Sequence, residues 1–257
     1  MIAVAPDVAA HVRPGWLVLD DVTVVEGAAS LDAPLAAAAS QMCGAAERPE
    51  LTAQVRAMYR RFGVDPTKTR PSSEALLRRI RKGEPLPRIN NAVDICNWCS
   101  LEFQVPYGLY DLARIEGAIE LRTGGAGESY AGIRKDDVHL QDRLVLADAR
   151  GAFGNPTSDS ARTRVTTDAR AILAVIFAPA PPPRYPGRET IARSRIIPMV
   201  RSANAEFQQQ HLKRRCGLRP NQVTGVAPMV IFVHYYGTGE DAVLAKGVRA
   251  AVDLLGR

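Results

Sequence analysis

Carboxylates, amides and hydroxyls, the groups that accept protons or bind polar ligands, gather in two segments of the sequence. The first segment contains Asn91, Asp94 and Asn97. Asp94 lies three residues before Asn97, so in a helix the two side chains share one face and could form one wall of a pocket. A buried hydrogen-bonding centre is the structural alternative for Asn97.

The second segment is a polar turn, which contains Asp159, Ser160, Arg162 and Thr163. These side chains could close a binding pocket, and they could equally pin neighbouring loops together. Asp111 lies between the two segments and directly follows Tyr110. A short carboxylate after a turn is often a cap for the backbone, which is the structural interpretation of Asp111.

Arginines cluster on two expected helices around the loop Gly63 to Pro71, and the chain carries a net charge of +6 with an isoelectric point of about 9.3. Guanidinium groups bind phosphate in a bidentate geometry, so this surface is a candidate for contact with an RNA backbone. A solvated helical face is the alternative, and Arg70 could pair with Glu74. Lys213, Arg214, Arg215 and Arg219 could extend the surface. The candidate RNA-binding residues are Arg60, Arg61, Arg70, Arg78, Arg79 and Arg81.

The bulk composition is that of a globular protein without a structural metal or disulfide framework. The chain has 257 residues, 46% hydrophobic, and its four cysteines show no disulfide spacing. Cys96 and Cys99 form a C-x-x-C inside an expected helix, and the other cysteines and histidines are scattered, so we predict no metal site. No apolar stretch approaches ~18 residues, and Met1 to Ala10 lacks a basic leader region, so we expect a cytoplasmic protein without a membrane span.

Periodicity and turn signals predict helices and strands in alternation. Val105 to Asp111 is expected to form a turn, and Ala178 to Pro186 a proline-rich linker. The remaining expected elements are a strand or strand pair over 14–25; helices over 31–42, 51–62, 73–82 (with Ser72 as N-cap), 90–102, 203–215 and 241–255; strands with hairpins over 113–177; and a strand over 229–236.

The segment Asn90 to Arg122 resembles the B3/B4 module of the phenylalanyl-tRNA synthetase β subunit. In that module asparagines flank a Val-Asp pair, and a P-L-H-A-F-D turn and a strand follow. The loop FGVDPTKTRPSSEALLRRI and the segment Thr157 to Thr166 resemble freestanding B3/B4 proteins, and the likeness covers roughly Trp16 to Ala178. The family's turn histidine falls on Gly108 here. The matching positions are Asn91, Val93, Asp94, Asn97, Pro106, Tyr110 and Asp111.

The resemblance implies a mixed α/β (α+β) fold like that of the synthetase editing domain. It predicts an aminoacyl-tRNA-binding domain over residues 10–180. A C-terminal extension over 183–257, of unknown role, would complete the same core or pack on it.

The resemblance also implies binding of the aminoacylated 3′ end of a tRNA and hydrolysis of a mischarged ester in trans, without a cofactor. Asp94, Asp159 and Asn97 are then the candidate catalytic residues. Asn91, Asp111, Ser160, Arg162 and Thr163 are the candidate substrate-binding residues. Two alternatives remain open: an aminoacyl transferase that uses a charged tRNA as donor in metabolite synthesis, and a non-catalytic module that binds tRNA or an amino acid. The oligomeric state is also open.

Overall fold

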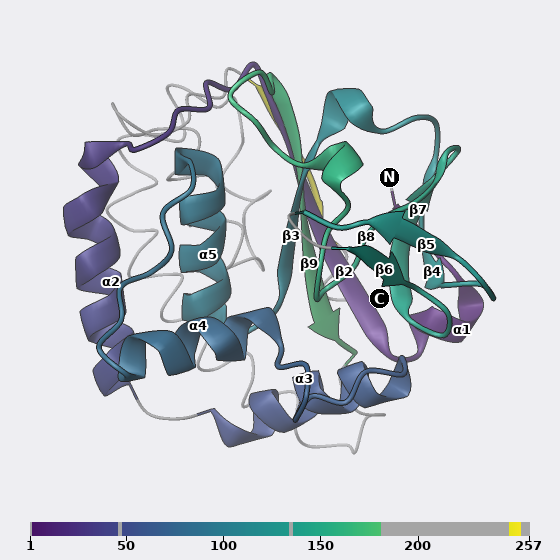
Figure 1. The fold of residues 1–257 in the computed structure, drawn as a ribbon, viewed down its shortest axis with the longest axis horizontal. Coiled ribbons are helices and arrows are strands. Elements are labelled where there is room, and N and C mark those ends of the chain that lie inside the picture. The colour runs from purple at the N-terminus through teal and green to yellow at the C-terminus, as the bar shows by residue number, and fades with distance from the viewer. Residues whose placement is uncertain (1, 46–47, 134–135, 181–246, 253–257) are drawn as a thin grey trace.

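The computed structural model describes residues 2–45, 48–133, 136–180 and 247–252. Three layers make up this part of the chain: a group of helices, a central four-stranded sheet, and a second four-stranded sheet on the far side of the central one (Figure 1). The mixed α/β class expected from the sequence is confirmed. Among the described residues, no helix has the length and apolar character needed to cross a membrane.

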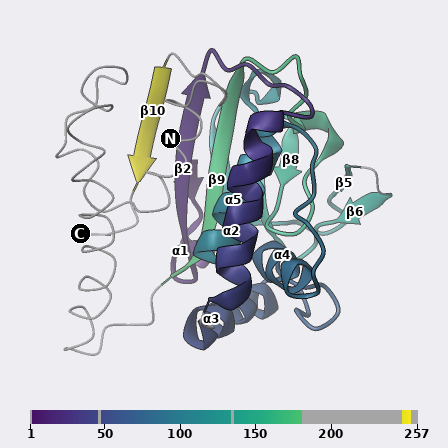
Figure 2. The same cartoon turned by 90° about the vertical axis from the view of Figure 1, so that its left-hand side faces the viewer.

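The central sheet has the order β10-β2-β9-β3 and is antiparallel throughout (Figure 2). Its longest ladder joins β2 (Val12–Asp20) to β9 (Ala171–Pro179), with Val12 opposite Pro179 and Asp20 opposite Ala171. β9 is buried along most of its length because helices cover one face and the second sheet covers the other. The outer strands are β3 (Tyr107–Asp111) and β10 (Gly247–Val252).

The second sheet has the order β1-β4-β7-β8. A separate hairpin of β5 (Ser129–Ala131) and β6 (Asp137–His139) lies beside it. The first strand pairs parallel with β4, so residues from Ile2 onward belong to this core. The strands of this sheet are β1 (Ile2–Val4), β4 (Ile119–Thr123), β7 (Leu144–Asp148) and β8 (Gly151–Gly154).

The helical layer centres on α5 (Asn91–Phe103), which packs against α4 and β3 and buries most of its residues. Asn90 caps it, because its side-chain oxygen accepts a hydrogen bond from the backbone N–H of Val93 at 2.9 Å. The other helices are α1 (Pro6–Ala9), α2 (Asp32–Gly44), α3 (Pro49–Arg61) and α4 (Ser72–Arg81), with short 3-10 turns η1 (Ala29–Leu31), η2 (Leu112–Arg114) and η3 (Ala161–Thr163).

Three local predictions were wrong. Residues 107–111 form the fully buried strand β3 instead of a turn, because they pair with β9. The cap position of α4 is taken by Pro71, and Ser72 is the first helical residue. Residues 247–252 form a strand instead of part of a helix, because the free edge of β2 pairs with their backbone. The other elements predicted beyond residue 180, and the rest of the proposed 183–257 extension, lie outside the described residues.

Candidate functional site

A polar loop, Asn155 to Asp159, is held by tyrosines from separate elements, and we call it the tyrosine-held loop. The Tyr59 hydroxyl on α3 donates to the Pro156 carbonyl oxygen at 2.6 Å. The Tyr130 hydroxyl on β5 donates to the Ser158 carbonyl oxygen. The Asn155 side-chain oxygen accepts the backbone N–H groups of Thr157 and Ser158 at 2.8 Å each. The loop is therefore fixed by both its own turn and distant elements.

Asp159 ends this loop, and its carboxylate is the group best placed for chemistry. The buried Tyr110 hydroxyl on β3 donates to Asp159 Oδ1 at 2.8 Å. Asp159 as a whole residue is partly exposed, but its carboxyl lies in a buried environment. Burial raises its pKa to about 7, although hydrogen bonds from Tyr110 and the Asn155 backbone oppose that rise. A carboxyl with this pKa exchanges protons near neutral pH.

The ring of Tyr110 lies against two glycines. A Cβ atom added at Gly108 would lie 2.1 Å from the Tyr110 hydroxyl oxygen, and one added at Gly154 would lie 2.3 Å from it. Both distances are far shorter than a real contact, so side chains at these positions are incompatible with the observed ring. Tyr110 also packs edge-to-face on Phe153, with ring centroids 5.1 Å apart.

A small, partly open cavity of about 10 Å³ borders the tyrosine-held loop, lined by Tyr59, Asn155, Pro156 and Thr157 among others. This volume corresponds to roughly one water molecule. An amino acid therefore does not fit inside this cavity.

Two of the predicted site residues on α5, Asp94 and Asn91, form hydrogen bonds within the protein. The Asp94 side chain is 1% exposed; its carboxylate accepts from Arg88 Nε at 2.7 Å and from the Ile89 backbone N–H at 2.8 Å. The Asn91 side chain is also buried, accepts the Val25 N–H at 3.0 Å and donates to the Thr23 carbonyl oxygen at 3.1 Å. These contacts tie α5 to the segments that precede it.

Three further predicted residues bond to nearby backbone. Asp111 caps η2, because its Oδ1 accepts the Ala113 N–H at 3.1 Å, and its Oδ2 pairs with Arg114 at 3.2 Å. Ser160 caps η3 by accepting the Arg162 N–H at 3.1 Å. The buried Thr163 hydroxyl donates to the Phe153 carbonyl oxygen at 3.2 Å. The Asp159–Thr163 turn thus pins loops together, which was the structural alternative.

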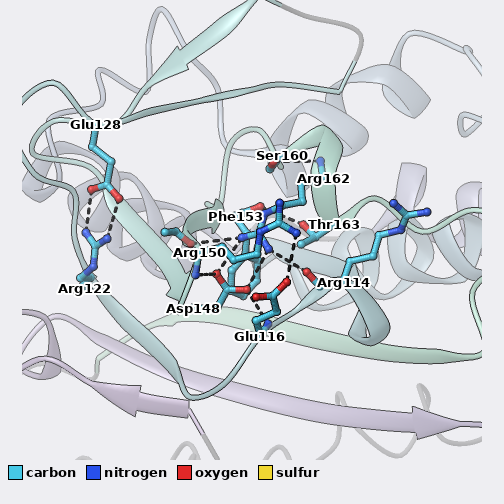
Figure 3. A network of polar contacts seen from close by, with 11 residues as sticks. Arg114, Glu116, Arg122, Glu128, Asp148, Arg150, Phe153, Ser160, Arg162 and Thr163 are labelled. Atoms are coloured by element: carbon cyan, nitrogen blue, oxygen red, sulfur yellow. Dashed lines mark hydrogen bonds and ion pairs between the residues drawn. The ribbon is translucent and has the colours of Figure 1, made fainter.

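Arg162 is fully engaged within the protein (Figure 3). It binds Asp148 through two hydrogen bonds of 3.0 Å, one to each carboxylate oxygen, and also donates to the Arg114 carbonyl oxygen at 2.8 Å. Burial would raise the pKa of Asp148, but hydrogen bonds from Arg162 and from backbone N–H groups lower it below its ordinary value. Arg162 therefore joins η2, η3 and the end of β7.

Asn97 lines an open groove of about 420 Å³ along α4, and Asp159 is not among the residues that line it. This volume is in the range of small-molecule sites. Ser72 also lines the groove, and its buried hydroxyl has no hydrogen-bond partner within the described part of the chain. The groove is basic at one side. Its remaining lining residues are Ala75, Leu76, Arg78, Arg79, Lys82, Glu84 and Pro87.

Some arginines of the predicted cluster bond to other groups in the described part of the protein, and others do not. Arg70 pairs with Glu74 at 3.0 Å, as the sequence suggested, and Arg79 pairs with Glu84 at 3.0 Å. Arg61 donates to His11 at 3.0 Å, and Arg81 donates to the Ala45 carbonyl oxygen at 3.5 Å. Within residues 2–180, the exposed Arg60 and Arg78 form no ion pair.

Sequence reasoning missed Tyr59, Tyr130 and Asn155 as parts of the site, and it treated Tyr110 only as a motif position. The three tyrosines are far apart in the chain, so spacing could not connect them. The Asn-Pro-Thr-Ser-Asp run did carry a signal, because asparagine followed by proline favours a self-bonded turn.

Comparison with known proteins identifies the family. The family model described as "B3/4 domain" matches residues 54–214, which is more than half of the chain. The chain is 34% identical over 126 residues to the phenylalanine–tRNA ligase β subunit of Thiobacillus denitrificans, covering 46% of this chain and 15% of that protein. It is 40% identical over 75 residues to the corresponding subunit of Chromobacterium violaceum, covering 29% of this chain and 10% of that one.

The chain thus spans only a small part of the length of these relatives. Among solved structures, an N-terminal fragment of the phenylalanyl-tRNA synthetase β subunit from Pyrococcus horikoshii matches with a TM-score of 0.36 and 14% identity, over 69% of this chain and 43% of that one. The sequence match over residues 54–214 establishes that the chain belongs to the B3/4 domain family.

Proposed function

We propose that the protein binds the aminoacylated 3′ end of a tRNA and hydrolyses a mischarged aminoacyl ester in trans. The observation that carries this proposal is the Asp159 carboxyl, which accepts a hydrogen bond from the Tyr110 hydroxyl at 2.8 Å and whose pKa burial raises to about 7. Membership of the B3/4 domain family, shared with phenylalanine–tRNA ligase β subunits, supports the choice of substrate.

In the proposed reaction, Asp159 acts as general base. Its carboxylate accepts a proton from water while the water oxygen attacks the ester carbonyl carbon. The bond between the carbonyl carbon and the ribose oxygen then breaks, and the proton passes from Asp159 to that ribose oxygen. The products are the free amino acid and the uncharged tRNA. Asp94 has no part in this scheme, because its carboxylate is already bonded to Arg88 and Ile89.

The groove along α4 is the proposed contact for the RNA. Arg78 and Lys82 line it and suit phosphates, and Asn97 could bond ribose or base groups. Of the predicted cluster, Arg60 and Arg78 are the members free to neutralise phosphate. Because such contacts release counterions, the affinity for tRNA should fall as salt rises.

The test is deacylation of a panel of charged tRNAs, including phenylalanine tRNA charged with tyrosine. Asp159→Asn keeps the size of the side chain and removes the base, and it should abolish the acceleration. Asp168→Asn is the matched control, because Asp168 is an exposed aspartate of the segment that follows. Unfolding temperatures of both variants show whether a loss of activity reflects a loss of fold.

The outcomes separate the alternatives. Ester loss that requires Asp159 supports the hydrolase. Loss that occurs only with an added amine, with the amino acid recovered on that amine, identifies a transferase. Binding of tRNA without any change in ester lifetime leaves the non-catalytic module, and activity that survives in Asp159→Asn refutes the assigned base.

A further inference from the structure

The space that a side chain at position 108 would need is occupied by the ring of Tyr110. Position 108 is a glycine, and the first atom of any side chain there would fall 2.1 Å from the hydroxyl oxygen and 2.6 Å from the Cζ atom of Tyr110. The same ring excludes a side chain at Gly154 on β8, where an added Cβ would lie 2.4 Å from Cε1. The observed position of the Tyr110 ring therefore requires glycine both at position 108 in the central sheet and at position 154 in the second sheet.

We propose that Tyr110 is a positioning residue: its hydroxyl fills the space that a side chain at position 108 would need, and it holds the Asp159 carboxylate in its reactive orientation. This inference rests on the proposed hydrolysis. Its basis is geometric, since the hydroxyl both blocks position 108 and donates to Asp159 Oδ1 at 2.8 Å.

The surroundings of Asp159 explain why this one hydrogen bond has a large effect. The titratable groups that face the carboxyl are Tyr59 from α3, Cys96 from α5, Tyr110 from β3 and Tyr130 from β5. Burial raises the pKa of each of these four groups, so they stay neutral at pH 7. With neutral neighbours, burial raises the pKa of Asp159 and hydrogen bonds lower it, so the loss of one hydrogen bond changes both the orientation and the pKa of the carboxyl.

Ring packing and hydroxyl function can be separated at this residue. The edge-to-face contact with Phe153 and the fit against the two glycines depend on the ring, which phenylalanine retains. Tyr110→Phe therefore removes the donor to Asp159 while leaving the packing in place. Tyr107→Phe is the matched control, because Tyr107 is a buried tyrosine on the same strand.

The closing experiment measures the pH profile of tRNA deacylation for the wild type, Tyr110→Phe and Tyr107→Phe. For Tyr110→Phe we expect kcat to fall about tenfold or more with little change in KM, because orientation of the base acts in the transition state. The lost hydrogen bond had favoured the carboxylate. The pKa of Asp159 should therefore rise, and the acid limb of the pH–rate profile should move up by about one pH unit, as expected for the loss of one hydrogen bond to a charged group.

A second measurement does not depend on activity. The carboxyl carbon of Asp159, assigned by comparison with Asp159→Asn, is titrated by NMR in the wild type and in Tyr110→Phe. An upward shift of the midpoint supports the role of Tyr110, and an unchanged midpoint overturns it. If the wild type hydrolyses esters and Tyr110→Phe matches it in kcat and pH profile, this inference fails while the proposed function stands. If the wild type hydrolyses none of the panel, the proposed function fails, and the titration alone decides the role of Tyr110.

Discussion

Replacement of Arg162 by methionine tests whether this side chain stabilises the fold or is available to bind a ligand. Asp148, its partner, has a fully buried side chain, and Arg162 is 20% exposed. Arg162→Met keeps much of the aliphatic volume but removes both 3.0 Å hydrogen bonds to Asp148 and the bond to the Arg114 carbonyl oxygen. It leaves a buried carboxylate without its cation.

The magnitude follows from what Asp148 retains. Breaking a buried ion pair by removing one partner costs about 3–5 kcal/mol. The Asp148 carboxylate still accepts the backbone N–H groups of Glu116 and Arg150 at 2.9 Å each, and these donors limit the penalty. We therefore expect a loss near the lower limit, about 3 kcal/mol in the free energy of unfolding.

Urea denaturation of the full chain at pH 7 measures this loss. Arg150→Met is the matched control, because Arg150 forms an exposed pair with Glu116 at 3.3 Å and should change stability by less than about 1 kcal/mol. Equal effects of the two substitutions would refute the reasoning, because they would show that burial of Asp148 adds nothing.

The pH dependence of the loss has a definite sign. The pKa of Asp148 is lowered by folding, so the pair stabilises the protein fully above the ordinary value of 3.8 and stops doing so as the pH falls through the lowered value. The gap between wild type and Arg162→Met should be constant from neutral pH down to about pH 5 and should narrow below about pH 4.

Three further predictions concern packing and RNA contact. Asn91→Ala removes the side-chain partners of the Val25 N–H and of the Thr23 carbonyl oxygen at a part-buried site, so urea denaturation should show a loss of about 1–2 kcal/mol. Gly108→Ala forces the Tyr110 ring to move and should cost about 1–3 kcal/mol, whereas an unchanged midpoint would show that the space before position 108 is free. Arg78→Gln should weaken tRNA binding and make it less sensitive to salt; a salt dependence equal to that of the wild type would remove the α4 groove from the interface.

Local patterns predicted α2 to α5 well because apolar periodicity is a local signal, whereas they missed α1 and predicted a helix where β10 forms. The predicted helix over 90–102 corresponds to α5 at Asn91–Phe103, and the one over 51–62 to α3 at Pro49–Arg61. The same kind of local signal failed at Val105–Asp111. Pro106 and Gly108 are typical of turns, yet the glycine is required by a ring two residues along the chain, and the strand exists because β9 pairs with it.

The candidate site could be predicted only in part from the sequence, for a related reason. Asp159 became a candidate through its polar turn, but its partner Tyr110 is 49 residues away. The other tyrosines that hold the Asn155–Asp159 loop come from α3 and β5. Contacts of this range follow from sheet order and register, which single-sequence patterns do not specify. Residues such as Asp94 and Arg162 looked like ligand-binding groups because a buried ion pair and a binding site use the same side chains.

The nine-residue ladder between β2 and β9 has a consequence for where this domain can be divided. The family match begins at residue 54, inside α3, whereas β2 lies at residues 12–20 and buries Leu17 and Leu19 in the core. A fragment that begins at residue 54 would expose one backbone edge of β9 and an uncovered apolar surface, conditions that favour aggregation. The family match and the central sheet therefore have different limits in this protein, and a fragment made to keep the sheet must include the N-terminal strands.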